Sequence, residues 1–141
     1  MLKGYFRTTF ALAGLVTMAL ASAGQARTIY ECTFEDRGPN RNWLPTIVYV
    51  AYDPGSEEVQ VSDPIIESVS GGPISVKPRT DNDARLSLRW TLMLESTAQN
   101  DFQWTYDFTV YKADNKAKIT GTPRGYSDTL YAPGTCKVKK G

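Results

Sequence analysis

The sequence contains no histidine in its 141 residues. This absence excludes a Ser-His-Asp triad, a nucleophilic cysteine–histidine pair and zinc held by histidine. There is also no glycine-rich phosphate-binding loop. Carboxylates remain, and Glu95 with Asp107 could in principle serve glycoside hydrolysis. Because neither carboxylate is expected to be buried, we predict that the protein is not an enzyme. A carboxylate-based hydrolase is the third of our functional alternatives.

An excess of charge of one sign is missing as well. The chain has 16 basic and 15 acidic residues, for a formal net charge of +1. Such a balance gives no reason to expect binding to nucleic acid or to an anionic membrane surface. The acidic run 81–83 resembles a fragment of a calcium loop but lacks the glycine and the bidentate glutamate that such a loop needs. We therefore expect a polar turn there, and we predict neither a metal nor a cofactor.

Long apolar stretches are limited to residues 10–21. This stretch follows Lys3 and Arg7 and precedes small residues, which is the pattern of a secretory signal peptide cleaved before Arg27. Its 12 residues fall short of the roughly 20 that span a bilayer, so a retained anchor is the weaker alternative. We expect a signal peptide over residues 1–26, one domain over residues 27–141, and a periplasmic or secreted location.

Cysteine occurs only twice, as Cys32 and Cys136. In an exported protein, two cysteines and no others indicate one disulfide. This disulfide would join the first predicted strand to the last. In the chain-entropy model, closing a loop of about 100 residues stabilises the fold by roughly 4–5 kcal/mol.

The sequence does contain long segments in which apolar and polar residues alternate strictly. Even positions from 86 to 94 and from 102 to 110 are apolar, whereas the odd positions between them are mostly polar. This pattern predicts a half-buried antiparallel hairpin over residues 85–112, with a loop at 96–100. The register that pairs Leu94 with Phe102 also places Arg89 opposite Asp107. Such an opposite-charge pair adds roughly 0.2–1 kcal/mol.

The rest of the chain alternates short apolar stretches with turn-forming residues. We expect turns at Asp63-Pro64 and Pro133-Gly134, among others. About eight to nine short strands with frequent turns indicate a small antiparallel β-barrel of the up-and-down type, or a β-sandwich, closed by the disulfide. The further short strand candidates are 28–34, 46–52, 58–62, 65–70, 74–77, 116–120, 126–131 and 135–139.

Five aromatic side chains of the hairpin are predicted to face the interior. They could line a small apolar pocket or simply fill the core, and a barrel of about eight strands is wide enough for either. Five large rings favour filling. Tyr106 is the residue that distinguishes a pocket from a filled core, because its hydroxyl needs a hydrogen-bond partner if the ring is buried. The candidate interior residues are Trp90, Phe102, Trp104, Tyr106 and Phe108.

Trp43 and Leu44 interrupt a polar loop. An exposed tryptophan flanked by Arg37 and Arg41 would suit contact with a protein or a sugar, so these four residues form a candidate partner-binding surface. Equally, Trp43 could fold back and plug one end of the barrel. A second, weaker patch comprises Arg124, Tyr126 and Tyr131.

The layout resembles two families of small barrels. Lipocalins often carry Gly-x-Trp near the first strand, and here residues 40–43 read Asn-Arg-Asn-Trp without that glycine. Residues 30–32, Tyr-Glu-Cys, are similar to the opening of small periplasmic lysozyme inhibitors, although the aromatic-Trp-x-Lys-Gly stretch of that family is missing. The first resemblance implies a carrier of a small apolar ligand, and the second implies a disulfide-tied barrel of the periplasm.

We therefore expect an exported binding or inhibitory module of the bacterial envelope. Its partner would be an envelope protein or a saccharide, and no membrane anchor would remain after cleavage. A lipocalin-like carrier of a small apolar ligand is the alternative.

Overall fold

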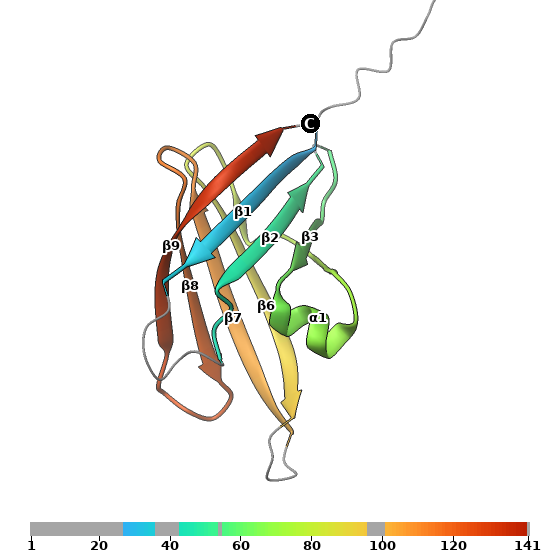
Figure 1. Ribbon diagram of the computed structural model, residues 1–141, viewed down its shortest axis with the longest axis vertical. Helices are drawn as coiled ribbons and strands as arrows, with labels where there is room; N and C mark the ends of the chain where they lie inside the picture. The colour runs from blue at the N-terminus through green and yellow to red at the C-terminus, as the bar shows by residue number, and fades with distance from the viewer. Residues whose placement is uncertain (1–26, 36–42, 54, 96–100, 141) are drawn as a thin grey trace, which may run out of the picture.

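The computed structural model describes residues 27–35, 43–53, 55–95 and 101–140 (Figure 1). Within these ranges, nine antiparallel strands form one sheet that curls into a half-barrel, accompanied by one short helix. In chain order the elements are β1 (Thr28–Phe34), β2 (Ile47–Tyr52), β3 (Val59–Ser62), α1 (Pro64–Ser70), β4 (Ile74–Val76), β5 (Thr80–Asp81), β6 (Arg85–Glu95), β7 (Asp101–Tyr111), β8 (Lys116–Pro123) and β9 (Leu130–Lys140).

The order of the strands follows the chain, apart from one break. The sheet runs β4-β3-β2-β1-β9-β8-β7-β6-β5. The first and last strands are therefore paired, and the sheet opens between β4 and β5 instead. The predicted all-β, up-and-down antiparallel architecture is confirmed, with the opening placed in the middle of the chain. Figure 1 shows α1 at this opening, beside β3 and β6.

The long hairpin forms in the predicted register. Leu94 lies opposite Phe102, and Arg89 lies opposite Asp107. The Arg89 guanidinium donates hydrogen bonds of 2.7 and 3.3 Å to the two carboxylate oxygens of Asp107. Both side chains are largely exposed, so this ion pair adds at most about 1 kcal/mol. Burial of the even-numbered side chains therefore does more than the ion pair to fix the register.

The predicted disulfide is confirmed. Cys32 on β1 lies directly opposite Cys136 on β9, and the two are bonded across a sequence separation of 104 residues. Cys32 is fully buried. The bond therefore joins adjacent strands at the place where the two halves of the chain meet.

The prediction of a strand at 65–70 is wrong, because these residues form α1. The Asp63 carboxylate accepts hydrogen bonds from the N–H groups of Ile65 (2.7 Å) and Ile66 (2.8 Å), which caps the helix. Pro64 occupies the first turn, where its missing N–H costs nothing. Gly71 ends the helix with a φ of 72°, a conformation that glycine adopts readily.

The predicted turn at Pro133-Gly134 is also wrong. β9 runs through both residues, and Pro133 pairs with Lys118 of β8. Gly134 pairs with Phe34 of β1, and a Cβ atom at this position would collide with the Thr33 carbonyl and the Phe34 ring. Glycine here allows the close approach of β1 rather than a change of chain direction.

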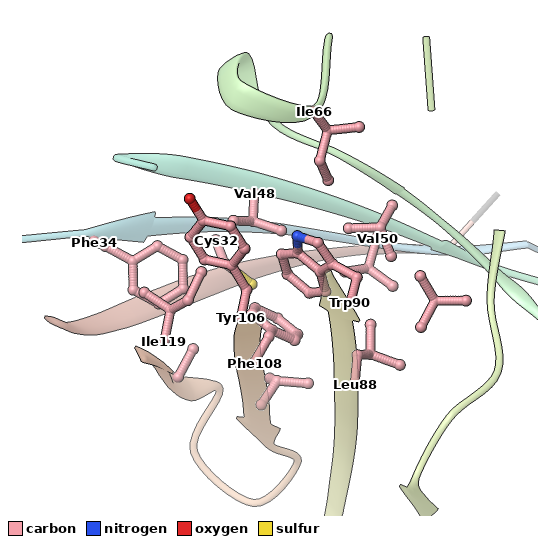
Figure 2. Close-up of a cluster of buried hydrophobic side chains, with 14 of the residues drawn as sticks. Cys32, Phe34, Val48, Val50, Ile66, Leu88, Trp90, Tyr106, Phe108 and Ile119 are labelled. Atoms are coloured by element: carbon pink, nitrogen blue, oxygen red, sulfur yellow. The ribbon is translucent and has the colours of Figure 1, made fainter. Parts of the chain in front are cut away.

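Side chains from both walls of the curl meet in one core. Figure 2 shows rings from β7 and β6, with Ile119 of β8, facing Cys32, Val48 and Val50 of β1 and β2. Ile66 of α1 is fully buried and covers the same core from the open side of the sheet. The helix is therefore part of the packing and not an appendage.

The alternation of the hairpin can be tested with neighbouring residues of β7. Trp104→Ala should cost about 3–5 kcal/mol, because it leaves a cavity where a buried ring stacks on two others. Thr105→Ala should cost under about 1 kcal/mol, because this side chain lies on the outer face. Urea unfolding of the two variants measures both costs. Equal costs would contradict the assignment of inner and outer faces.

Candidate functional site

A groove lies where α1 faces the far end of the β6–β7 hairpin. Its volume is about 710 Å³, which is within the range of ligand-binding sites in proteins. The groove exists because the sheet opens between β4 and β5, so that α1, rather than another strand, stands beside this end of β6. Its walls are Pro64, Ile65, Ser68 and Val69 from α1, Met93, Leu94 and Glu95 from β6, Asp101 from β7, and Trp43.

The groove combines exposed apolar side chains with two carboxylates. Met93 is 54% exposed and Val69 is 42% exposed, and both line the same groove. Exposed apolar side chains that gather in one place, unlike single ones, often mark a binding site. Glu95 and Asp101 lie directly opposite each other across the hairpin. No lysine or arginine is among the nine lining residues. The groove therefore suits an apolar group next to a positive charge.

Asp63 holds the helix that forms one wall. Only 2% of Asp63 is exposed. Burial raises the pKa of Asp63 to about 6, although the two backbone N–H bonds to the carboxylate act in the opposite direction. The negative charge of nearby Glu67 raises this pKa further.

Trp43 joins the groove to the core. Its ring stacks on Trp104 at 5.1 Å between centroids and contacts Phe102 at 5.9 Å. Its carbonyl oxygen accepts a 2.9 Å hydrogen bond from the Tyr106 hydroxyl, which satisfies the one polar group of that buried ring. Trp43 is half-buried, so it acts as a plug and also presents part of its ring to the groove.

Of the other members of the predicted partner-binding surface, the structure describes only Leu44. Leu44 is corrected from a surface residue to a core residue, because only 7% of it is exposed. Its side chain packs where Gly121 leaves room, since a Cβ atom there would lie 2.9 Å from Leu44 Cδ2. Arg37 and Arg41 lie outside the described residues, so this part of the prediction stays a prediction.

The predicted interior rings pack against one another. Trp104, Tyr106 and Trp90 form a continuous series, with centroids 6.2 and 5.9 Å apart. Phe108 lies 6.3 Å from Trp90 and is fully buried. Phe102 is half-buried against Trp43. Burial raises the pKa of Tyr106, and the nearby charge of Asp63 adds to this effect. These contacts favour rings that fill the interior over rings that line a pocket.

Two donors in this interior have no partner among the described residues. They are the indole Nε1 atoms of Trp90 and Trp104. Figure 2 shows the nitrogen of Trp90 turned toward Ile66 of α1. A buried donor without an acceptor typically costs about 1–3 kcal/mol. These groups are the feature of the interior that would suit a small molecule with a hydrogen-bond acceptor.

The carboxylate pair that the sequence suggested for glycoside hydrolysis, Glu95 and Asp107, does not come together. Asp107 lies six residues further along β7 than Asp101, which faces Glu95. At about 3.3 Å per residue, Glu95 and Asp107 are roughly 20 Å apart, beyond the separation that glycoside hydrolysis requires. Asp81 binds Lys112 Nζ at 2.8 Å. Across the described ranges, no three acidic, cysteine or histidine side chains come together in a way that could hold a metal ion.

The weaker patch lies on the outer face of the sheet. Arg124 donates a 3.1 Å hydrogen bond to the Gln103 side chain, beside Tyr126, which is 70% exposed. Tyr131 is exposed on β9.

Sequence reasoning missed most of the groove. The apolar pattern predicts a strand for Ile65 and Val69, and a strand there gives no reason to expect these residues beside Met93. The signal that would have found them is Asp63-Pro64 followed by Gly71, a start and a stop for a helix of two turns. Met93 breaks the polar pattern of the odd positions in β6 and marks the other wall.

Comparison of the chain with models of protein families, with curated proteins and with solved structures finds no match. No helix in the described part of the chain has the length and hydropathy needed to cross a membrane. The functional conclusion therefore depends on the groove itself.

The raised pKa of Asp63 predicts a dependence of stability on pH. Its value of about 6 in the fold exceeds the ordinary 3.8, so the folded state holds the proton more tightly than the unfolded state. This contribution is fully present below about pH 4 and is lost as the pH rises through about 6, a change of up to about 3 kcal/mol. Asp63→Asn keeps a hydrogen-bond acceptor without the charge. Its free energy of unfolding should therefore rise relative to the wild type between about pH 4 and about pH 7.

Denaturant unfolding at a series of pH values measures this difference. Asp128→Asn is the matched control, because Asp128 is exposed. The control should follow the wild type throughout. A pH-independent loss of stability in Asp63→Asn would contradict the expectation and would indicate that the cap works best as an ionised group.

Proposed function

We propose that the protein is an exported binding or inhibitory module of the bacterial envelope, which holds part of a partner protein in the groove between α1 and the β6–β7 hairpin. The groove is the observation that carries this proposal. It places exposed Val69 and Met93 beside two carboxylates at the open part of the sheet. Contacts between proteins commonly use a small apolar centre with a polar rim.

Export is supported by two features. The apolar stretch 10–21 with its flanking residues has the pattern of a signal peptide. The disulfide between Cys32 and Cys136 is compatible with an oxidising compartment outside the cytoplasm. A periplasmic or secreted location follows from these features as part of the proposal.

A carrier of a small ligand is the second candidate. The unpartnered indole N–H groups of Trp90 and Trp104 favour it, because an acceptor on a bound molecule would satisfy them. The mutual packing of the interior rings counts against it, because a ligand would have to displace Trp90 or Tyr106 from a ring contact. We therefore rank the groove above the interior.

Export can be tested on protein from the native host. Mass spectrometry should give an N-terminus at or near Arg27, and alkylation without reduction should label no thiol, because both cysteines are bonded. A full-length chain with two alkylatable cysteines would contradict the proposed location.

Use of the groove can be tested with a photo-crosslinking amino acid at Met93, whose side chain is exposed at the groove wall. In envelope extract, this variant should give a discrete adduct with a protein that mass spectrometry identifies, and the same adduct should form with that protein purified. A Val69→Asp substitution in the Met93 variant should remove the adduct, because it places a charge in the apolar part of the groove.

The matched control carries the same amino acid at Tyr131, which is exposed to a similar extent (47%) but lies on β9. Equal adducts from both positions, or none from Met93, would count against the groove. Saturable binding of an apolar dye, with a change in tryptophan fluorescence that Val69→Asp leaves unaltered, would favour the carrier instead.

A further inference from the structure

The main-chain groups of β6 point alternately to its two edges. The Lys112 N–H donates to the Ala84 carbonyl at 2.9 Å, so the even-numbered residues of β6 direct their N–H and C=O groups toward β7. The Arg79 N–H donates to the Ser87 carbonyl at 2.9 Å, so the odd-numbered residues direct theirs toward the opposite edge. This second edge faces the opening of the sheet.

In the described part of the chain, most of that edge has no strand hydrogen-bonded to it. β5 pairs only with Ser87 and Leu86 at the start of β6. Further along, within the described residues, no main-chain hydrogen bond engages the outward N–H or C=O groups of Thr91 and Met93. Proteins usually protect such an edge with proline, a bulge, an inward-pointing charge or a covering helix or loop. Thr91–Glu95 contains no proline and pairs with β7 without a bulge, and α1 contacts β6 without a main-chain hydrogen bond to Thr91 or Met93.

The free edge forms one side of the groove. Met93, Leu94 and Glu95 line it from β6, and Ile65 and Val69 line it from α1. The helix contacts β6, and the groove of about 710 Å³ lies between these lining residues toward the far end of the strand. An edge strand with a helix beyond it is a recurrent geometry for binding an extended peptide, which joins the sheet by main-chain hydrogen bonds and places alternate side chains in the groove.

The charges at the end of the groove indicate what the peptide should carry. Glu95 and Asp101 are directly opposed, and like charges in such a pair destabilise a hairpin. No cation lies among the residues that line the groove. A lysine or arginine of the bound segment would offset this repulsion.

We infer that the groove binds an extended segment of a partner protein that adds as a strand to the free edge of β6 at Thr91–Glu95, with apolar side chains against α1 and a basic residue beside Glu95 and Asp101. This inference rests on the proposed function, because it specifies how the partner occupies the same groove.

Thr91→Pro tests the strand addition directly. It removes the N–H that points to the free edge and leaves the hydrogen bonds to β7 in place, because those come from even-numbered residues. Proline is tolerated on edge strands for this reason. Thr91→Val is the matched control, because it changes the side chain and keeps the N–H. Near-ultraviolet circular dichroism and thermal unfolding check that both variants fold.

The probe is a phage-displayed library of random short peptides selected on the purified protein, followed by synthesis of the best-recovered sequence. Selected peptides should alternate apolar residues and carry lysine or arginine. The synthetic peptide should bind Thr91→Pro at least about tenfold more weakly than the wild type, and Thr91→Val within about threefold. In wild-type protein, the peptide should slow amide hydrogen exchange at Thr91 and Met93, a readout that does not depend on the proline variant folding.

The remaining outcomes overturn the inference in distinguishable ways. Peptide binding that is lost in Val69→Asp but unchanged in Thr91→Pro, without protection of Thr91, leaves the groove as a binding site and removes the strand addition. If no peptide is selected but the crosslinker at Met93 still forms an adduct with a protein, the groove likewise remains a binding site and the strand addition is removed. If neither peptide binding nor a protein adduct from Met93 is found, the proposed function is overturned as well. Self-association of the wild type that Thr91→Pro abolishes would identify a second copy of the chain as the occupant.

Discussion

The pairing of β1 with β9, locked by Cys32–Cys136, determines where the sheet is open. In a meander whose ends are not joined, the gap would lie between the first and last strands. Here those strands are neighbours and are covalently linked, so the sheet opens between β4 and β5. The chain fills that opening with α1, whose Ile66 completes the core. The groove is what remains between this helix and the edge of β6.

The hairpin was predictable because two independent constraints agree on it. Each arm has an apolar residue at every second position over most of its length, and only registers that keep those residues together can bury them. The pairing of Arg89 with Asp107 then selects among the allowed registers, although its own contribution is small. The disulfide was predictable for a similar reason, since a chain with two cysteines leaves only one possible pair within it.

The helix and the last strand were not predictable by the same reasoning, because local preference and tertiary packing disagree there. Ile65, Ile66 and Val69 have high β propensity, but capping by Asp63 and burial of Ile66 favour a helix. Pro133 and Gly134 are turn formers by composition. They remain in a strand because β1 approaches so closely that only glycine fits at position 134. For the strand, the deciding contact comes from β1, which is distant in sequence, whereas for the helix the local cap by Asp63 acts together with the burial of Ile66.

Trp43 shows why the candidate site could be only half predicted. Its position in a polar loop suggested either a surface contact or a plug, and no feature of the sequence separates these. In the structure the residue packs as a plug, because its carbonyl satisfies Tyr106 and its ring stacks on Trp104, and the ring also lines the groove. A partner bound in the groove would therefore contact Trp43, which stacks on Trp104 at the end of the aromatic series in the core. The ring contacts from Trp43 through Trp104 and Tyr106 to Trp90 thus connect the groove to the middle of the core.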